Sequence, residues 1–208
     1  FTYNFAKDIQ DTTPVFKIPD PTFLMQLPKT KVLEKLERLG IDINKPSVGI
    51  LLYGNRKFSQ DIYSFFHNQG MQLIALSMYN EVADFNLGHE LNPFEWAQIF
   101  KYFKFVVTDR FHGTIFCLKN HTKFISVEPK KLSNYKVESK IYSLLEDFDM
   151  TYNHLDIYSN NYNFHKFEEK YQYINDYWNT QNIDKHLQEM QDICMKYIYK
   201  IKRNISEN

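Results

Sequence analysis

The densest group of residues able to do chemistry lies in the middle of the chain, directly after a short apolar run. Residues 108–114 read TDRFHGT, which places the guanidinium of Arg110 and the imidazole of His112 two positions apart. Arginine offers a planar fork of donors that matches phosphate or carboxylate, and histidine exchanges a proton near neutral pH. Gly113 would let a ligand approach the backbone, and Gly113 and Thr114 lie in a predicted helix whose first N–H groups favour anions. We therefore expect this turn to bind a small anion.

Two other basic segments are predicted to reach the same place. Arg56 and Lys57 follow an earlier apolar run, and Lys140 lies near the start of a later helix. We expect these three cations to make secondary contacts with the anion, from their location alone. Solvated surface side chains are the structural alternative for all three.

The central turn also has a purely structural interpretation. Asp109 would then cap the following helix, Arg110 would pair with a surface carboxylate, and His112 would be a buried or surface histidine without chemistry. The spacing of these residues leaves both interpretations open.

The elements that must position these residues follow from apolar periodicity and turn residues. Asn92-Pro93-Phe94-Glu95 has the pattern of a capping box, and Ser59 is the predicted cap of an earlier helix that Gly70 closes. Buried strands are predicted at 47–53, 71–76, 105–108 and 124–127, and helices at 32–39, 59–70, 93–102, 112–118, 137–148 and within 165–203.

Short buried strands that alternate with helices pair in parallel, because each helical crossover returns the chain to the same end of the sheet. The pattern therefore predicts an α/β fold with a doubly wound parallel sheet. In such sheets ligands bind beyond the carboxyl ends of the strands. The turns at residues 54–57 and 108–114 both follow strands, so both are predicted to lie at that edge.

Composition excludes several classes of protein. The 25 Lys and Arg residues balance 25 Asp and Glu residues, so a nucleic-acid partner is not expected. With 18 Phe and 15 Tyr the chain is not expected to be globally disordered. Cys117 and Cys194 have no metal-ligand spacing, which favours a reducing cytoplasm and no metal site. The basic end at 196–203 leaves peripheral contact with the inner face of a membrane as an alternative to a solvated helix.

Three ordered blocks of this sequence resemble the polysaccharide pyruvyl transferase family. Residues 92–116, NPFEWAQIFKYFKFVVTDRFHGTIF, are similar to the family's hallmark helix and strand, which lead to a [Ser/Arg]-[Phe/Leu]-His-Gly turn. Residues 18–24, IPDPTFL, and residues 138–145, ESKIYSLL, resemble its flanking blocks. The resemblance covers about residues 15–150.

The resemblance implies one half of a GT-B-like architecture, in which two Rossmann-like halves enclose the active site. This chain would be the C-terminal half, and because it begins with Phe1 we expect a missing N-terminal half of the parent protein. Residues 1–24 would be the linker or entry segment, 25–150 the Rossmann-like donor-binding domain, and 151–208 a helical extension packing on it.

The activity implied by the resemblance is transfer of pyruvate from phosphoenolpyruvate to a sugar of a surface polysaccharide, such as a capsule or exopolysaccharide, or its lipid-linked precursor, forming a ketal. Arg110 and His112 match family positions that contact the donor, and no cofactor beyond the donor substrate is implied. Two alternatives remain open. One is a GT-B-type glycosyltransferase that uses a nucleotide sugar, and the other is a non-catalytic carbohydrate-binding module.

Overall fold

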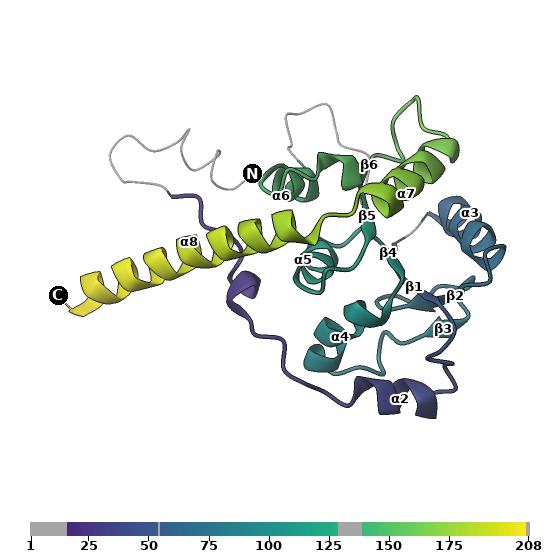
Figure 1. The fold of residues 1–208 in the computed structure, drawn as a ribbon, viewed down its shortest axis with the longest axis horizontal. Helices are drawn as coiled ribbons and strands as arrows, with labels where there is room; N and C mark the ends of the chain where they lie inside the picture. The colour runs from purple at the N-terminus through teal and green to yellow at the C-terminus, as the bar shows by residue number, and fades with distance from the viewer. Residues whose placement is uncertain (1–15, 54, 129–138, 207–208) are drawn as a thin grey trace.

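A parallel sheet with helices on both faces forms the centre of the computed structural model, which describes residues 16–53, 55–128 and 139–206 (Figure 1). The strand order is β3-β2-β1-β4-β5-β6, and each neighbouring pair is parallel. The predicted α/β class, with a Rossmann-like doubly wound parallel sheet, is confirmed. The strands are β1 (Ser47–Leu51), β2 (Gln72–Ala75), β3 (Phe85–Asn86), β4 (Phe105–Thr108), β5 (Phe124–Val127) and β6 (His154–Leu155).

The helices fill the connections between the strands. In Figure 1, α3 and α7 lie on one side of the sheet, and α2, α4, α5 and the start of α8 lie on the other, while the end of α8 projects from the body. The helices are α2 (Val32–Arg38), α3 (Arg56–His67), α4 (Pro93–Ile99), α5 (Phe111–Lys119), α6 (Lys140–Glu146), α7 (His165–Tyr177) and α8 (Thr180–Ser206), with short 3-10 helices η1 (Pro21–Leu24), η2 (Phe100–Tyr102) and η3 (Thr151–Asn153).

Alternation of side chains along the strands divides the interior into two apolar cores. In β4, Val106 packs in one core together with α4 and α5, while Phe105 and Val107 pack in the other with α3 and α7. Successive side chains of a strand point to opposite faces, so a strand covered on both faces must be apolar throughout. This is why β4 reads as a continuous apolar run, and why its length was predictable.

The structure corrects the predicted elements at three places. The two-residue strands β3 and β6 were not predicted, because two residues carry no periodic signal. β6 pairs with β5, so the sheet extends beyond residue 150 into the segment predicted to be a helical extension. Apart from this strand, the predicted boundary at residue 150 between a donor-binding domain and a C-terminal extension stays a prediction. The predicted Ser59 cap is wrong: Asn55 caps α3 by accepting a hydrogen bond from the N–H of Phe58 at 2.9 Å.

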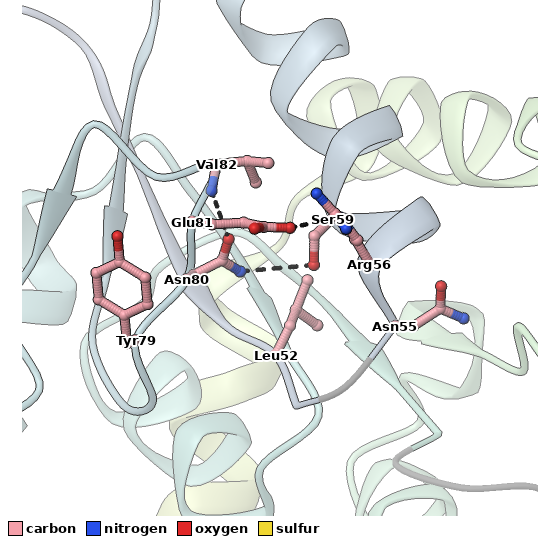
Figure 2. Close-up of a pocket in the computed structure, with 8 residues that line it drawn as sticks. All are labelled: Leu52, Asn55, Arg56, Ser59, Tyr79, Asn80, Glu81 and Val82. Atoms are coloured by element: carbon pink, nitrogen blue, oxygen red, sulfur yellow. Dashed lines mark hydrogen bonds and ion pairs between the residues drawn. The ribbon is translucent and has the colours of Figure 1, made fainter.

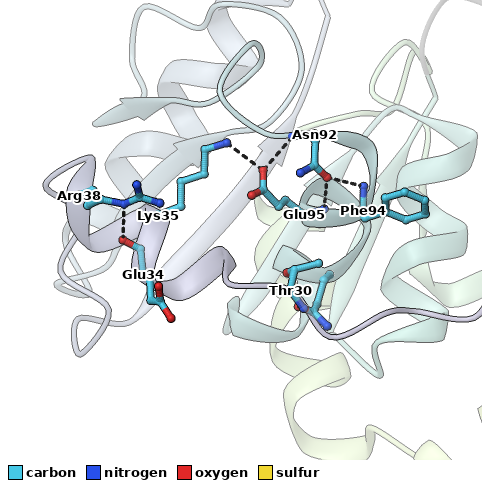
Figure 3. A network of polar contacts seen from close by, with 8 residues as sticks. Thr30, Glu34, Lys35, Arg38, Asn92, Phe94 and Glu95 are labelled. Atoms are coloured by element: carbon cyan, nitrogen blue, oxygen red, sulfur yellow. Dashed lines mark hydrogen bonds and ion pairs between the residues drawn. The ribbon is translucent and has the colours of Figure 1, made fainter.

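The predicted capping box at the start of α4 is confirmed (Figure 3). Asn92 Oδ1 accepts from the N–H of Glu95 at 3.0 Å, and Glu95 Oε2 accepts from the N–H of Asn92 at 2.9 Å. The same carboxylate pairs with Lys35 of α2 at 2.9 Å. The hydrogen bond from Lys35, followed by that from the Asn92 N–H, lowers the pKa of Glu95. The box therefore also joins two helices.

This lowered pKa predicts a pH dependence of stability. A carboxyl group whose pKa is lower in the folded state stabilises the fold above its unfolded-state pKa of about 4.3, and this contribution is lost as the pH falls further. Glu95→Gln should therefore be less stable than wild type at neutral pH and should lose less stability on acidification. Urea unfolding at a series of pH values measures both effects.

The matched control is Glu34→Gln, whose side chain is well exposed and pairs with Lys31 at 3.4 Å. An exposed pair of this kind contributes little. If Glu95→Gln and wild type lost the same free energy of unfolding between neutral and acidic pH, the linkage through Glu95 would be wrong.

Candidate active site at the carboxyl edge of the sheet

The order of the strands reverses between β1 and β4. The chain leaves β1 toward β2 on one side and returns to β4 on the other, although Leu51 and Thr108 are paired neighbours. The two following turns therefore diverge, and such a switch point is where open parallel sheets bind ligands. The described residues 55–57 and the turn at 108–114 follow these two strands, as predicted.

A buried carboxylate joins the two turns. Asp109 Oδ2 accepts a hydrogen bond from the N–H of Tyr53 at 2.5 Å, and Asp109 Oδ1 lies 3.0 Å from Nε of Arg110. Burial raises the pKa of Asp109, although the Tyr53 N–H and the Arg110 charge act against this rise. The helix α5 is capped at the following residue without a side-chain hydrogen bond, so Asp109 is not a helix cap. Its role is to link β4 to the end of β1.

The Arg110 side chain is held from two sides and is still accessible. Its guanidinium lies over the Tyr53 ring at 5.4 Å, and its side chain is 39% exposed. The Nε atom and Asp109 Oδ1 are close but not aligned, and both are buried without a hydrogen-bond partner within the described part of the chain. The carboxylate beside Arg110 is thus a buried one, which contradicts the alternative of a surface pair. The exposed part of the Arg110 guanidinium can still bind an anion.

His112 lies on the first turn of α5, and its side chain is 58% exposed. Its Nε2 atom is 3.5 Å from Oδ2 of Asp20, in the segment that leads into η1. Burial acts to raise the pKa of Asp20, but hydrogen bonds from Thr22 and the nearby His112 outweigh it and lower that pKa. An ionised carboxylate therefore faces the imidazole. The structure brings His112 and Arg110 to the same exposed edge.

The two residues after His112 pack against the sheet. A Cβ atom on Gly113 would lie 2.4 Å from Oγ1 of Thr108 and 3.3 Å from Leu51 Cδ2, so the absent side chain makes room for the sheet and not for a ligand. Thr114 is fully buried, with its hydroxyl 2.7 Å from that of Ser126 and its N–H bonded to the Arg110 carbonyl. The Thr114 hydroxyl is therefore occupied within the protein, whereas anion binding by the N–H groups of this turn stays a prediction.

The two cations after β1 separate. Arg56 forms an ion pair with Glu81 at 2.5 Å and lines a pocket at the ends of β1 and β2. Lys57 pairs with Asp61 at 2.8 Å and lines a different hollow beside Phe164. Consecutive helical residues point about 100° apart, so only Arg56 faces the carboxyl edge. The structure therefore does not bring Lys57 to the hollow that Arg56 lines, and its contact with the anion stays a prediction.

Lys140 lies close to the entry segment. It lines a hollow of about 190 Å³ together with Asp20, Phe111 and Lys17. The ring of Phe111 is 5.6 Å from that of His112, so this hollow adjoins the imidazole. The predicted placement of Lys140 near the site is compatible with this geometry, whereas its contact with a ligand stays a prediction.

The entry segment extends along α5 and is attached near both ends of that helix. Asp20 faces His112 at the start of the helix. Near its end, Lys119 Nζ donates to the carbonyl oxygens of Thr22 at 2.8 Å, Phe23 at 3.0 Å and Met25 at 2.5 Å. Burial lowers the pKa of this Lys119 amine. The position of α5 therefore depends on residues more than eighty positions earlier in the sequence.

A comparison with protein families shows which family the chain belongs to. The family model for polysaccharide pyruvyl transferase matches residues 1–131, which include β1 to β5 and the whole Arg110 turn. The chain belongs to the polysaccharide pyruvyl transferase family. The third resembling block, 138–145, lies outside the matched range. No curated protein and no solved structure matches the chain significantly.

Two residues of the candidate site in this member of the polysaccharide pyruvyl transferase family were not predicted from the sequence. Asp20 appeared only within the resembling block 18–24, and Tyr53 only as the end of a predicted strand. Nothing in the spacing indicates that Asp20 reaches His112, because 92 positions separate them and the contact depends on how η1 packs on α5. The resemblance of residues 18–24 to a family block was the available signal.

The described residues contain neither a group of metal ligands nor a membrane-spanning helix. No group of three or more His, Cys, Asp or Glu side chains there could hold a metal ion. Within the same residues, no helix has the length and apolar character needed to cross a membrane.

The contact between Gly113 and Thr108 generates a prediction. Gly113→Ala should destabilise the protein by about 1–3 kcal/mol, since the new methyl group overlaps Thr108 Oγ1 and overpacking has costs of this size. Urea unfolding measures the loss. The double variant Thr108→Ala/Gly113→Ala should lose less than the sum of the two single variants, because the overlapping atom is gone. Strict additivity would contradict a packing role for Gly113.

Proposed function

We propose that this chain provides the donor site of a pyruvyl transferase, which moves pyruvate from phosphoenolpyruvate to a saccharide and forms a ketal. The observation that carries the proposal is the half-exposed Arg110 guanidinium at the switch point, beside His112 and within a turn of the family's hallmark pattern. Family membership supports a transferase that acts in polysaccharide biosynthesis. The donor, the ketal and the roles below are our proposal.

Arg110 is suited to hold the phosphate of the donor. Its Nε atom already faces Asp109, so the carboxylate and the Tyr53 ring fix the plane of the guanidinium before any ligand arrives. Within the described chain, the terminal nitrogens of Arg110 have no side-chain or backbone acceptor. A planar pair of donors binds two phosphate oxygens, and charge-assisted hydrogen bonds contribute about 1.5–3 kcal/mol each. The N–H groups of the first turn of α5 add to this site.

His112 is suited to deliver the proton that starts the reaction. Protonation of the methylene carbon of phosphoenolpyruvate forms a methyl group and leaves a cationic carbon at C2. The oxygen of one sugar hydroxyl adds to C2, and its proton is released. The bond between C2 and the phosphate oxygen breaks, and a second hydroxyl of the same sugar adds to C2 and completes the ketal. One of the two hydroxyl protons restores His112 and the other leaves with phosphate. Asp20, ionised beside Nε2, would orient the imidazole for this step.

The scheme requires no metal or cofactor beyond phosphoenolpyruvate. Its partners are that donor, a saccharide or lipid-linked saccharide acceptor, and the preceding half of the parent protein, which would complete the cleft. A nucleotide-sugar glycosyltransferase shares this architecture and serves as the competing hypothesis in the tests.

The first test concerns binding of the donor. Phosphoenolpyruvate should stabilise this chain against heat, and Arg110→Ala should weaken its binding about tenfold or more, since one charge-assisted contact of about 1.5–3 kcal/mol is lost. Lys57→Ala is the matched control, because that cation faces a different hollow. Stabilisation by nucleotide sugars with no response to phosphoenolpyruvate would favour the glycosyltransferase.

The second test concerns the reaction. In the full-length enzyme, His112→Ala should abolish pyruvyl transfer, and Asp20→Asn should lower kcat with little change in KM for the donor. In Asp20→Asn the His112 imidazole keeps its position but no longer has an ionised carboxylate beside it. Coupled detection of released phosphate measures both variants. Undiminished transfer by His112→Ala would remove this histidine from the mechanism.

A further inference from the structure

A second pocket lies on the same edge of the sheet and is not used by the donor scheme. It has a volume of about 300 Å³ and is formed by the end of β1, the first turn of α3 and the loop between β2 and β3. Figure 2 shows side chains from these elements facing one another across it. β1 lies between β2 and β4, so the pocket and the Arg110 turn follow neighbouring strands. A ligand here would be close to a donor at Arg110.

The charges of this pocket do not favour an anion. Arg56 was predicted to bind the donor, but its Nε atom is 2.5 Å from Oε1 of Glu81 across the pocket (Figure 2). The pair brings one positive and one negative charge, so it adds no net charge to the pocket. A phosphate would have to displace Glu81 or lie beside it. The pocket therefore offers donors and acceptors without net charge.

The other polar groups are held in place before a ligand arrives. Asn80 Oδ1 accepts from the N–H of Val82 at 3.1 Å, and its Nδ2 lies 3.5 Å from Oγ of Ser59 (Figure 2). A further hydrogen bond holds the loop between β2 and β3: Asn86 Oδ1 accepts from the N–H of Asn80 at 2.7 Å. The Asn80 amide and the Ser59 hydroxyl, with the more exposed Arg56–Glu81 pair beside them, match a ligand that has several hydroxyl groups.

An aromatic ring stands at the rim. Tyr79 lines the pocket, yet 81% of its surface is exposed to solvent. Burying an exposed aromatic ring against an apolar ligand face is favourable, and Tyr combines such a surface with a polar tip. A pyranose ring presents a face of C–H groups and an edge of hydroxyl groups. The ring of Tyr79 and the polar floor of the pocket match these two sides.

We propose that this pocket binds a neutral pyranose ring of the saccharide acceptor. Tyr79 contacts the C–H face of the sugar, while Asn80, Glu81 and Arg56 hydrogen-bond to its hydroxyl groups. Binding of a neutral sugar is independent of the donor chemistry, whereas its role as acceptor rests on the proposed function. The site would place sugar hydroxyls one strand away from the carbon that accepts them.

Solution NMR of the isotope-labelled chain tests the proposal, with methyl β-galactopyranoside, methyl β-glucopyranoside and inorganic phosphate as probes. At least one glycoside should shift the amide signals of residues 79–82, and phosphate should not. Tyr79→Ala should weaken glycoside binding about fivefold or more, which corresponds to the loss of one contact of ordinary strength. Tyr79→Phe should restore it, because the ring face remains.

Two controls separate this site from its surroundings. Tyr177→Ala removes another exposed tyrosine, 69% accessible on α7, and should leave glycoside binding unchanged. Glu81→Gln leaves the Arg56 charge without its anionic partner, so phosphate should now shift the signals of residues 79–82. The absence of any glycoside response there at millimolar concentrations, or phosphate binding at Arg56 in the wild-type chain, would overturn the proposal.

Failure here is distinguishable from failure of the proposed function. Phosphoenolpyruvate should shift the amide signals of residues 110–113, and Arg110→Ala should remove these shifts while leaving glycoside binding intact. Glycoside binding without any response to phosphoenolpyruvate would keep the sugar pocket and reject the pyruvyl donor. The reverse result would keep the donor site and reject the sugar pocket.

Discussion

The link between Asp109 and Tyr53 is the constraint on which the rest of the site depends. At a switch point the two turns diverge: the last paired residues of β1 and β4 are Leu51 and Thr108, followed by a backbone hydrogen bond from the Asp109 N–H to the Leu51 carbonyl at 2.9 Å. The buried Asp109 carboxylate spans this gap by accepting from the Tyr53 N–H, and it also sets the position of Arg110. Burying a carboxylate is costly unless it is paired and hydrogen-bonded. In this fold the buried carboxylate lies at the switch point between β1 and β4.

Much of the scaffold was predictable because it depends on local signals. β4 and β5 have the bounds that their apolar runs predict, and the Asn92–Glu95 box starts α4 as its sequence indicates. β3 and β6 were not predictable, since each pairs through only two residues and is held by its neighbours in the sheet. Local pattern thus predicts the interior strands and misses the edges.

The candidate site was predictable only in part, for a different reason. The location of Arg110 and His112 follows from the general rule for parallel sheets, which needs the strand order but no side-chain detail. The partners of these residues come from distant segments: Asp20 precedes η1, and Tyr53 follows β1. The type of Gly113 indicates a close approach without naming the approaching atom, and in the structure Thr108 Oγ1 lies where its side chain would be. Residue types indicate the chemistry, and packing decides which atoms meet.

The attachment of the entry segment near both ends of α5 makes the helix and that segment move as one body. Asp20 faces His112 at the start of the helix, and Lys119 at its end binds the carbonyl oxygens of residues 22, 23 and 25. The environment of the His112 imidazole is therefore shared between two distant parts of the chain, and a substitution among residues 20–25 would be felt at the start of α5.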